Sequence, residues 1–178
     1  MWDAITAGAA AESPLWADAT MAEGEQNREL VFSPLAPEVH ALGLETIYEG
    51  YLVHYGRSRL FAPGDRDMAL LLGDYLYAHG LVRIAEQGEV AVVADLSDLL
   101  SLCAQLRAEP EPSDADDDGV LWAATFALVG SSDPSLVTAR TALRDEGDPA
   151  PLASLAARVA GDDPVAAALA LHRARLAV

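Results

Sequence analysis

Apolar residues recur at helical spacing along most of the chain, and no stretch alternates apolar and polar positions for long enough to predict a strand. The segment most like a strand is 89–94. It continues into 95–100 with apolar positions three and four residues apart, so we predict helix for the whole stretch. The pattern predicts an all-α fold, an antiparallel helix bundle with no sheet.

Capping residues set the predicted helix boundaries. Asp133, Asp148 and Asp163 are each followed directly by Pro. A carboxylate that accepts the free amides of a first turn, with Pro in the first helical position, is typical of a helix start. Gly64 and Asp65 mark a similar start. The predicted helices span 37–55, 65–87, 90–108, 120–129, 135–144, 150–159 and 165–176; residues 1–34 are expected to be partly helical and irregular, and 109–119 to form an acidic loop.

The helix predicted at 65–87 is apolar around most of its circumference. Between residues 67 and 85 it has few polar positions, chiefly Asp74, His79 and Arg83. Such a helix is typical of the centre of a bundle, where every side is covered by neighbours. We therefore expect this helix in the centre, with the long helices before and after it packed alongside.

Length and charge narrow the classes of function. The 178 residues fit one domain spanning 1–178, and 28 acidic against 11 basic residues give a net charge of −17. Such a chain lacks the basic surface that binds nucleic acid or anionic membranes. Every basic residue is Arg, and the absence of Lys excludes a Schiff-base lysine and a phosphate-loop lysine.

The single cysteine, Cys103, excludes an intrachain disulfide and a cysteine zinc site, and its apolar neighbours predict a buried thiol. The N-terminus lacks the basic flank of a secretory signal. No apolar run reaches the roughly 20 residues that a spanning helix needs. We therefore expect a cytoplasmic protein with no membrane insertion.

Two acidic clusters are candidates for metal chemistry. Residues 114–118 include four Asp, whose oxygens could bind a divalent cation. The run lacks the ligand spacing of a calcium-binding loop, and its place before a predicted helix favours a solvated loop and helix start. Asp162 precedes the expected cap Asp163 and is interpreted as an exposed neighbour. We predict no metal site.

The histidines have no metal-binding spacing. His40, His54, His79 and His172 include no pair four residues apart, so they cannot form a helical zinc motif. His79 lies among apolar neighbours, where a buried histidine with satisfied hydrogen bonds is expected rather than a ligand or base.

Helix 37–55 carries two polar stripes. Tyr48, Tyr51 and Tyr55 share one stripe, which favours an amphipathic core face over a cofactor site. Glu45 and Glu49 share another, but paired-carboxylate chemistry on a sugar would also need a cleft. The chain has no Gly-x-Ser-x-Gly turn and no glycine-rich phosphate loop. We therefore predict no catalytic residues and no cofactor.

One helix resembles a known family. Segment 68–78, which contains Gly73-Asp74-Tyr75-Leu76, resembles the "LLAGDYL" helix of the trans-polyprenyl diphosphate synthases. It is most similar to the small non-catalytic component of the two-part heptaprenyl diphosphate synthases. Segments 44–54, 81–89 and 119–130 are similar to other parts of that family, so the resemblance spans about 42–130 in order.

The chain departs from the family where catalysis would occur. The first aspartate-rich motif is replaced by Tyr55-Gly56-Arg57 after His54, and no Phe-Gln precedes Asp162. Without these motifs the chain cannot hold the Mg²⁺ ions that neutralise a diphosphate. The resemblance therefore implies part of the isoprenoid synthase fold in a non-catalytic accessory or regulatory subunit. The partner it implies is a catalytic synthase chain. The aromatic stripe and the predicted central apolar helix favour a homodimer as the alternative.

Three alternatives remain open. The chain could be a stand-alone helical binder of an apolar small molecule, a helical interaction module unrelated to prenyl metabolism, or an enzyme of another class. A ligand-binding site is expected beside the helix of the resemblance, lined by Tyr51, His54, Leu72, Asp74, Tyr75 and His79. An enzyme would instead require Glu45 or Glu49 to converge with Asp74, His54 and Arg57 in one cleft.

Overall fold

The computed structural model describes residues 1–108 and 115–176, with the side chains of 115–117 excepted. Its α-helices are α1 (Trp2–Glu12), α2 (Pro14–Ala19), α3 (Ala41–Tyr55), α4 (Arg66–Ala85), α5 (Val90–Ala108), α6 (Ala115–Leu128), α7 (Pro134–Glu146), α8 (Ala150–Ala160) and α9 (Asp162–Leu176). Short 3₁₀ turns cover Glu23–Glu25, Ser33–Leu35 and Glu38–His40. Within the described ranges the β structure consists of a single bridge, Thr20 to Phe61. The predicted all-α class is confirmed.

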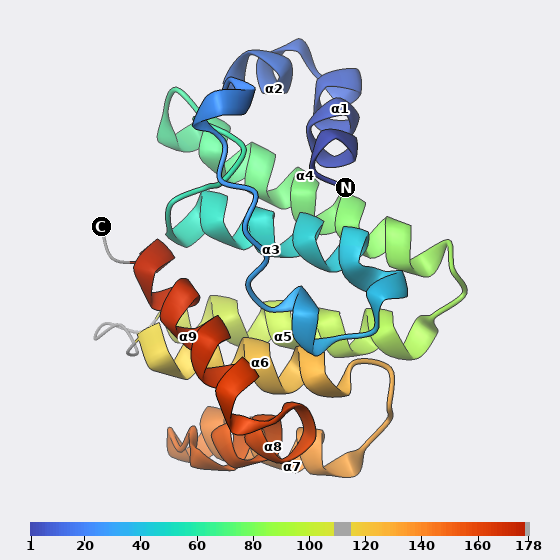
Figure 1. Cartoon of the computed structure of the whole chain (residues 1–178), viewed down its shortest axis with the longest axis vertical. Helices are drawn as coiled ribbons and strands as arrows, with labels where there is room; N and C mark the ends of the chain where they lie inside the picture. The colour runs from blue at the N-terminus through green and yellow to red at the C-terminus, as the bar shows by residue number, and fades with distance from the viewer. Residues whose placement is uncertain (109–114, 177–178) are drawn as a thin grey trace.

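The helices form layers along the long axis of the molecule (Figure 1). Helices α1 and α2 lie at one end, followed by the α3–α4 pair, the α5–α6 pair and the α7–α8 pair. Helix α9 crosses α6 and returns toward the end of α3, where the Arg57 amide donates to the Arg175 carbonyl at 2.9 Å. Among the described residues, no helix is both long and apolar enough to span a membrane.

Helix starts agree with the predicted caps in part. Asp65 Oδ1 accepts from the Met68 amide at 2.7 Å, and Asp133 Oδ1 accepts from the Ser135 amide at 2.8 Å. Asp148 accepts from the Ala150 amide at 2.9 Å, but it lies one residue further from its helix than predicted. The prediction of Asp163 as a cap is wrong. The chain turns at Gly161, with φ of 92°, and α9 begins at once with Asp162.

The acidic loop is shorter than predicted. Helix α6 begins at Ala115, so the prediction of loop is wrong over 115–119, while 109–114 lie outside the described residues. The helix therefore extends backward from the apolar segment into 115–119.

Helix α3, not α4, occupies the centre. All of α3 from Gly43 to Val53 is buried, whereas α4 exposes Leu70, Leu71 and Val82 by 46%, 64% and 50%. The prediction of a central α4 is therefore wrong. The two glutamates of α3 are paired inside the protein, as described below.

Four glycines bring α3 and α4 into backbone contact. A Cβ on Gly80 would lie 2.9 Å from the Gly43 carbonyl oxygen, and one on Gly50 would lie 2.9 Å from the Gly73 carbonyl oxygen. Each helix carries its two glycines seven residues apart, which places them on one face. The antiparallel helices therefore pack at a separation that a side chain at any of these positions would prevent.

Candidate functional site

The two glutamates of α3 close around one arginine. Arg59 Nη1 donates to Glu45 Oε2 at 2.6 Å, and its Nε donates to Glu49 Oε2 at 2.8 Å. All three residues are fully buried, and Glu45 Oε1 has no hydrogen-bond partner among the described residues. Burial lowers the pKa of Arg59, but Glu49 and Glu45 outweigh that effect and raise it. The guanidinium is therefore held in its charged form.

Neighbouring groups complete the shell around this ion cluster. Ser58 Oγ donates to Glu49 Oε1 at 2.5 Å, and the Arg59 amide donates to the same oxygen at 2.8 Å. The rings of Trp2 and Tyr48 lie 4.8 and 5.1 Å from the guanidinium carbon, in the geometry of cation–π contacts. The cluster ties α1 and the segment after α3 to α3, and its charged groups are closed to solvent.

A second closed cluster lies where α3, α5 and α6 meet. Arg107 and the Tyr51 hydroxyl both donate to Asp118 Oδ2, and Arg107 Nη2 also donates to the Tyr51 hydroxyl oxygen at 2.9 Å. Burial raises the pKa of Asp118, against the opposing effect of the hydrogen bonds from Tyr51 and Arg107. Asp118 is fully buried, so the prediction of a solvated acidic run is wrong at this residue.

The tyrosine stripe of α3 faces the interior, as predicted. Tyr48 and Tyr51 are fully buried, and each ring centroid lies 5.1 Å from that of Trp122 on α6. The Tyr48 hydroxyl is 2.9 Å from His172 Nδ1 on α9. Burial raises the pKa of both tyrosines. The stripe joins three helices through aromatic packing and hydrogen bonds, and so belongs to the core.

His54 and Asp74 form the one ion pair among the six residues predicted to bind a ligand. His54 Nε2 lies 3.2 Å from Asp74 Oδ1 across the α3–α4 contact, where Gly73 leaves room for the imidazole. The His54 side chain is 7% exposed and that of Asp74 is 75% exposed. Burial lowers the pKa of His54, against the opposing effect of Asp74. The carboxylate therefore orients a largely uncharged imidazole near neutral pH.

Three other predicted residues face the N-terminal helices. Leu72 is fully buried in a cluster with Ile5 of α1. The Tyr75 ring lies 4.2 Å from that of Trp16 and 5.2 Å from that of His79. His79 Nε2 is buried and makes no hydrogen bond with the described residues, so His79 is not the satisfied histidine that was expected.

The six predicted residues therefore face three different surroundings. Tyr51 points toward α5 and α6, His54 and Asp74 pair with each other, and the remaining three pack toward α1 and α2. The residues of the enzyme alternative are also dispersed: Glu45 and Glu49 enclose Arg59, while exposed Arg57 donates to the Ala174 carbonyl at 2.7 Å. Across the described ranges, no group of three or more His, Cys, Asp or Glu side chains is placed to hold a metal ion.

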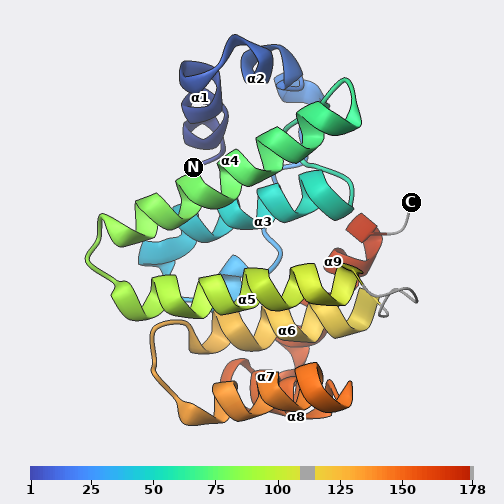
Figure 2. The ribbon, with the colours of Figure 1, turned by 180° about the vertical axis from the view of Figure 1, so that it is seen from behind.

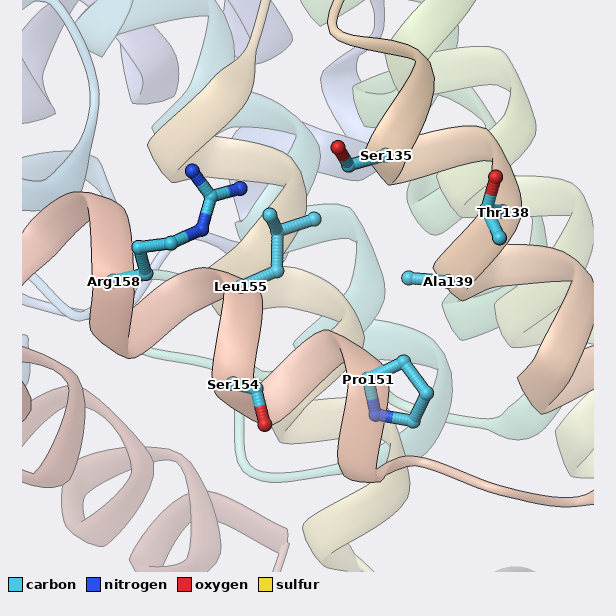
Figure 3. A pocket seen from close by; sticks show the side chains of 7 residues that line it. All are labelled: Ser135, Thr138, Ala139, Pro151, Ser154, Leu155 and Arg158. Atoms are coloured by element: carbon cyan, nitrogen blue, oxygen red, sulfur yellow. The ribbon is translucent and has the colours of Figure 1, made fainter.

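A groove lies between α7 and α8 (Figure 3), in a different layer from α3 and α4, which carry the predicted site (Figure 1). Its volume is about 350 Å³. Ala139, Leu155 and Pro151 give it an apolar lining, and Arg158 lies at its edge. The groove is also lined by the hydroxyl-bearing residues Ser135, Thr138 and Ser154. This mixture suits an apolar group with a polar or anionic neighbour.

Sequence reasoning missed the buried arginines. Arg140 lies on the same stripe of α7 as Leu136 and Leu143, so the helical period could have placed it inside the protein. Its Nη2 donates to Thr125 Oγ1 at 3.0 Å, and its Nη1 lies 3.4 Å from a carboxylate oxygen of Asp95. Arg59 follows a helix in an irregular segment, where no periodic signal marks it as buried.

Cys103 is buried on α5, as predicted, and burial raises the pKa of its thiol well above the ordinary value. A thiol in this state is a weak nucleophile, because only the thiolate reacts readily.

The chain was compared with models of protein families, with curated proteins and with solved structures, and none of them matches. The resemblance to polyprenyl diphosphate synthases therefore stays a prediction from the sequence.

Proposed function

We propose that this chain is a non-catalytic helical protein that acts by binding a partner, and that the partner is the catalytic chain of a polyprenyl diphosphate synthase. The binding function is supported by the groove between α7 and α8. The identity of the partner is supported by the similarity of segment 68–78 to that family.

The groove has the features of a docking site for a protein side chain. Apolar floor residues Ala139 and Leu155 are themselves buried in the core, so the floor is rigid. Small pockets that accept an aromatic or aliphatic anchor commonly supply most of the binding energy in a protein interface.

Arg158 adds charge selectivity to the groove. It makes no ion pair within 4 Å among the described residues, although Asp133 is close enough for Arg158 to contribute to the lowered pKa of that carboxyl. In a protein with a net charge of −17, an unpaired guanidinium beside an apolar pocket favours a partner with an acidic residue next to its apolar anchor.

The buried ion clusters support a non-catalytic role. Glu45, Glu49 and Asp118 are fully buried, and each is bound to an arginine of this chain. Their charges stabilise contacts between helices, and a substrate would have to break those contacts to reach them.

Co-expression with a catalytic polyprenyl synthase chain from the same source tests the proposal. We expect the two chains to co-purify. Thr138→Arg would fill the groove and weaken binding by about tenfold or more, the loss of one interface anchor. Thr141→Arg is the matched control, because Thr138 and Thr141 are both exposed on α7 and each hydroxyl donates to the carbonyl four residues earlier.

The outcomes separate the two parts of the proposal. If the wild-type chain binds no catalytic synthase chain, the assignment of the partner is wrong. If it binds and Thr138→Arg binds as well as Thr141→Arg, the groove is not the docking site.

A second candidate function is the binding of a small apolar molecule in the same groove. Its volume of about 350 Å³ lies at the lower end of the range for small-molecule sites, ~300–1,000 Å³. Octanol and octanoate are suitable probes, monitored by chemical shifts of the groove residues. Saturable shifts in the wild type that Thr138→Arg abolishes would support this function; shifts that persist in the variant would exclude the groove as the binding site.

A further inference from the structure

Helix α1 packs beside α4 at one end of the molecule (Figure 2). It has 11 residues, of which Ile5 and Ala9 are buried. Both belong to an apolar cluster with Leu72 and Leu76 of α4, and this cluster is separate from the main core. An isolated helix of this length is only marginally stable in water. The order of α1 therefore depends on its contact with the rest of the chain.

Two basic side chains of α4 lie beneath α1, at a glycine. A Cβ on Gly8 would lie 3.2 Å from His79 Nε2 and 3.3 Å from Arg83 Nη2. Arg83 Nη2 also donates to the Ala4 carbonyl at 3.2 Å. His79 and Arg83 are four residues apart, so they lie on the same face of α4. The contact of α1 thus includes two neighbouring side chains that can both carry a positive charge.

His79 is placed where a second ring proton is unfavourable. Its Nε2 is buried and makes no hydrogen bond with the described residues. The neutral imidazole can keep this nitrogen unprotonated, with its proton on Nδ1. Protonation would turn Nε2 into an N–H donor that has no acceptor and that faces α1. The docked position of α1 therefore opposes protonation of this imidazole.

The charged groups around His79 add to this effect on balance. Burial, and then Arg83, lower the pKa of His79. Two carboxylates oppose them, Glu86 after α4 and Glu12 at the end of α1. The Tyr75 ring, stacked on the imidazole at 5.2 Å, brings no charge. Removal of α1 would return Nε2 to water, and water would solvate the charged form.

The chain has a hinge from which α1 can move. Ser13 separates α1 from α2 and has an extended backbone, with φ of −147° and ψ of 133°. Beyond α2 the chain is anchored, since the Met21 amide donates to the Leu60 carbonyl at 2.9 Å and the Ala62 amide to the Ala19 carbonyl at 2.7 Å. A rotation at Ser13 can therefore move α1 while the segment after α2 stays in place.

We propose that α1 is an acid-sensitive flap, which protonation of His79 releases from α4 by rotation at Ser13, so that Leu72 and Leu76 are uncovered. The contacts of α1 with Arg28 and Arg59 set the equilibrium between the docked and released states, and the charge on His79 shifts it. This device is independent of the proposed function, because the α7–α8 groove lies at the opposite end of the molecule.

Amide hydrogen exchange between about pH 5 and 8 measures the release of α1. Protection factors, which remove the intrinsic pH dependence of exchange, are compared between α1 and α3. In the wild type, protection of α1 relative to α3 should fall as the pH decreases below about 6.5, by up to about tenfold per pH unit, because release is coupled to the uptake of one proton.

Two glutamine variants identify the histidine. His79→Gln cannot take up the proton, so protection of its α1 should stay constant over the same pH range. His54→Gln is the matched control, because His54 lies at the α3–α4 contact and pairs with Asp74. It should keep the fall in α1 protection seen in the wild type. Circular dichroism confirms that each variant is folded.

The reciprocal effect is measured on an unaltered His79. Ile5→Ser removes an apolar contact of α1 and should lower the protection of α1 at every pH. Because proton binding and docking oppose each other, release of α1 should raise the pKa of His79 toward its ordinary value of about 6.5. Titration of the imidazole signals by NMR gives this shift, and the signals of His54 in the same spectra should titrate as in the wild type.

Three results would overturn the proposal. The first is protection of the wild-type α1 that does not change with pH, or that falls equally in His79→Gln. The second is an Ile5→Ser variant whose α1 is as protected as that of the wild type. The third is an Ile5→Ser variant whose α1 is released while the pKa of His79 stays unchanged.

Discussion

Arg59 shows how one residue holds several parts of the chain together. Its guanidinium neutralises Glu45 and Glu49 on α3 and packs against Trp2 of α1. Removal of the cation would leave carboxylates in the interior without their counterion. The cost of that change is set by the desolvation of the remaining charges more than by the loss of the attraction itself.

The first prediction concerns this cluster. Arg59→Met should lower the free energy of unfolding by about 3–5 kcal/mol, the range found when one partner of a buried ion pair is removed. Urea denaturation measures the change. Arg57→Met is the control: Arg57 is exposed and donates to one carbonyl, so its loss should cost no more than about 1 kcal/mol. Equal effects of the two variants would contradict the role assigned to the buried cluster.

The second prediction concerns His54. Burial lowers its pKa in the folded protein, while in the unfolded chain it titrates near the ordinary value of 6.5. The unfolded state therefore binds the proton more tightly, and protonation favours unfolding. The free energy of unfolding should rise as the pH increases toward and through about 6.5. His54→Gln should show a smaller rise over the same range.

The comparison of slopes isolates His54 from the other histidines. His79 contributes in the same direction, since burial and then Arg83 lower its pKa, and it is present in both proteins. Denaturation curves at several pH values between about 5 and 8 give the two slopes. An unchanged slope in His54→Gln would show that this imidazole does not affect stability through its proton.

At the scale of elements, the contact between α3 and α4 decides how the molecule is built. Gly43 and Gly50 on α3 meet Gly80 and Gly73 on α4, so that backbone packs on backbone. This close approach leaves one side of α4 against α3 and turns its opposite side outward. The exposure of Leu70, Leu71 and Val82 is therefore a consequence of how the glycines position α4.

The third prediction tests this contact. A Cβ on Gly80 would lie 2.4 Å from Ile47 Cγ1 and 2.9 Å from the Gly43 carbonyl oxygen. Alanine favours a helix over glycine by roughly 0.5–1 kcal/mol, but the collision outweighs that gain. Gly80→Ala should destabilise the protein by about 1–3 kcal/mol. Gly64→Ala, where no atom lies within 4 Å, should be neutral or stabilising in the same urea experiment.

Helix positions were predictable from the sequence because their causes are local. The range 90–108 was predicted as observed, and the caps at Asp65 and Asp133 form the hydrogen bonds expected of them. Asp163 does not cap α9, because the chain turns at Gly161 and the helix already begins at Asp162.

The arrangement of the helices was less predictable because its causes lie between distant residues. The burial of Glu45 and Glu49 depends on Arg59, and that neighbour lies outside any helix. The acidic run ends in a buried Asp118 for the same reason, since Arg107 comes from another helix. The groove between α7 and α8 depends on how two helices pack, which spacing within either helix does not determine.

At the scale of the whole molecule, acidic residues outnumber basic ones, and several arginines pair with acidic residues inside the protein. The chain carries a net charge of −17. Three of the few arginines are instead used inside the protein, where Arg59, Arg107 and Arg140 each bind at least one acidic residue. The groove lies on this surface, and several apolar side chains of α4 are also exposed.

An assay of prenyl chain elongation tests the central claim most directly. A catalytic polyprenyl synthase chain, this chain, and an equimolar mixture are each supplied with the allylic and homoallylic diphosphate substrates and Mg²⁺. The account predicts no product from this chain alone, and a change in the rate or the length of the products when it is added to the catalytic chain. Product formed by this chain alone, or a mixture that behaves like the catalytic chain by itself, would contradict the account.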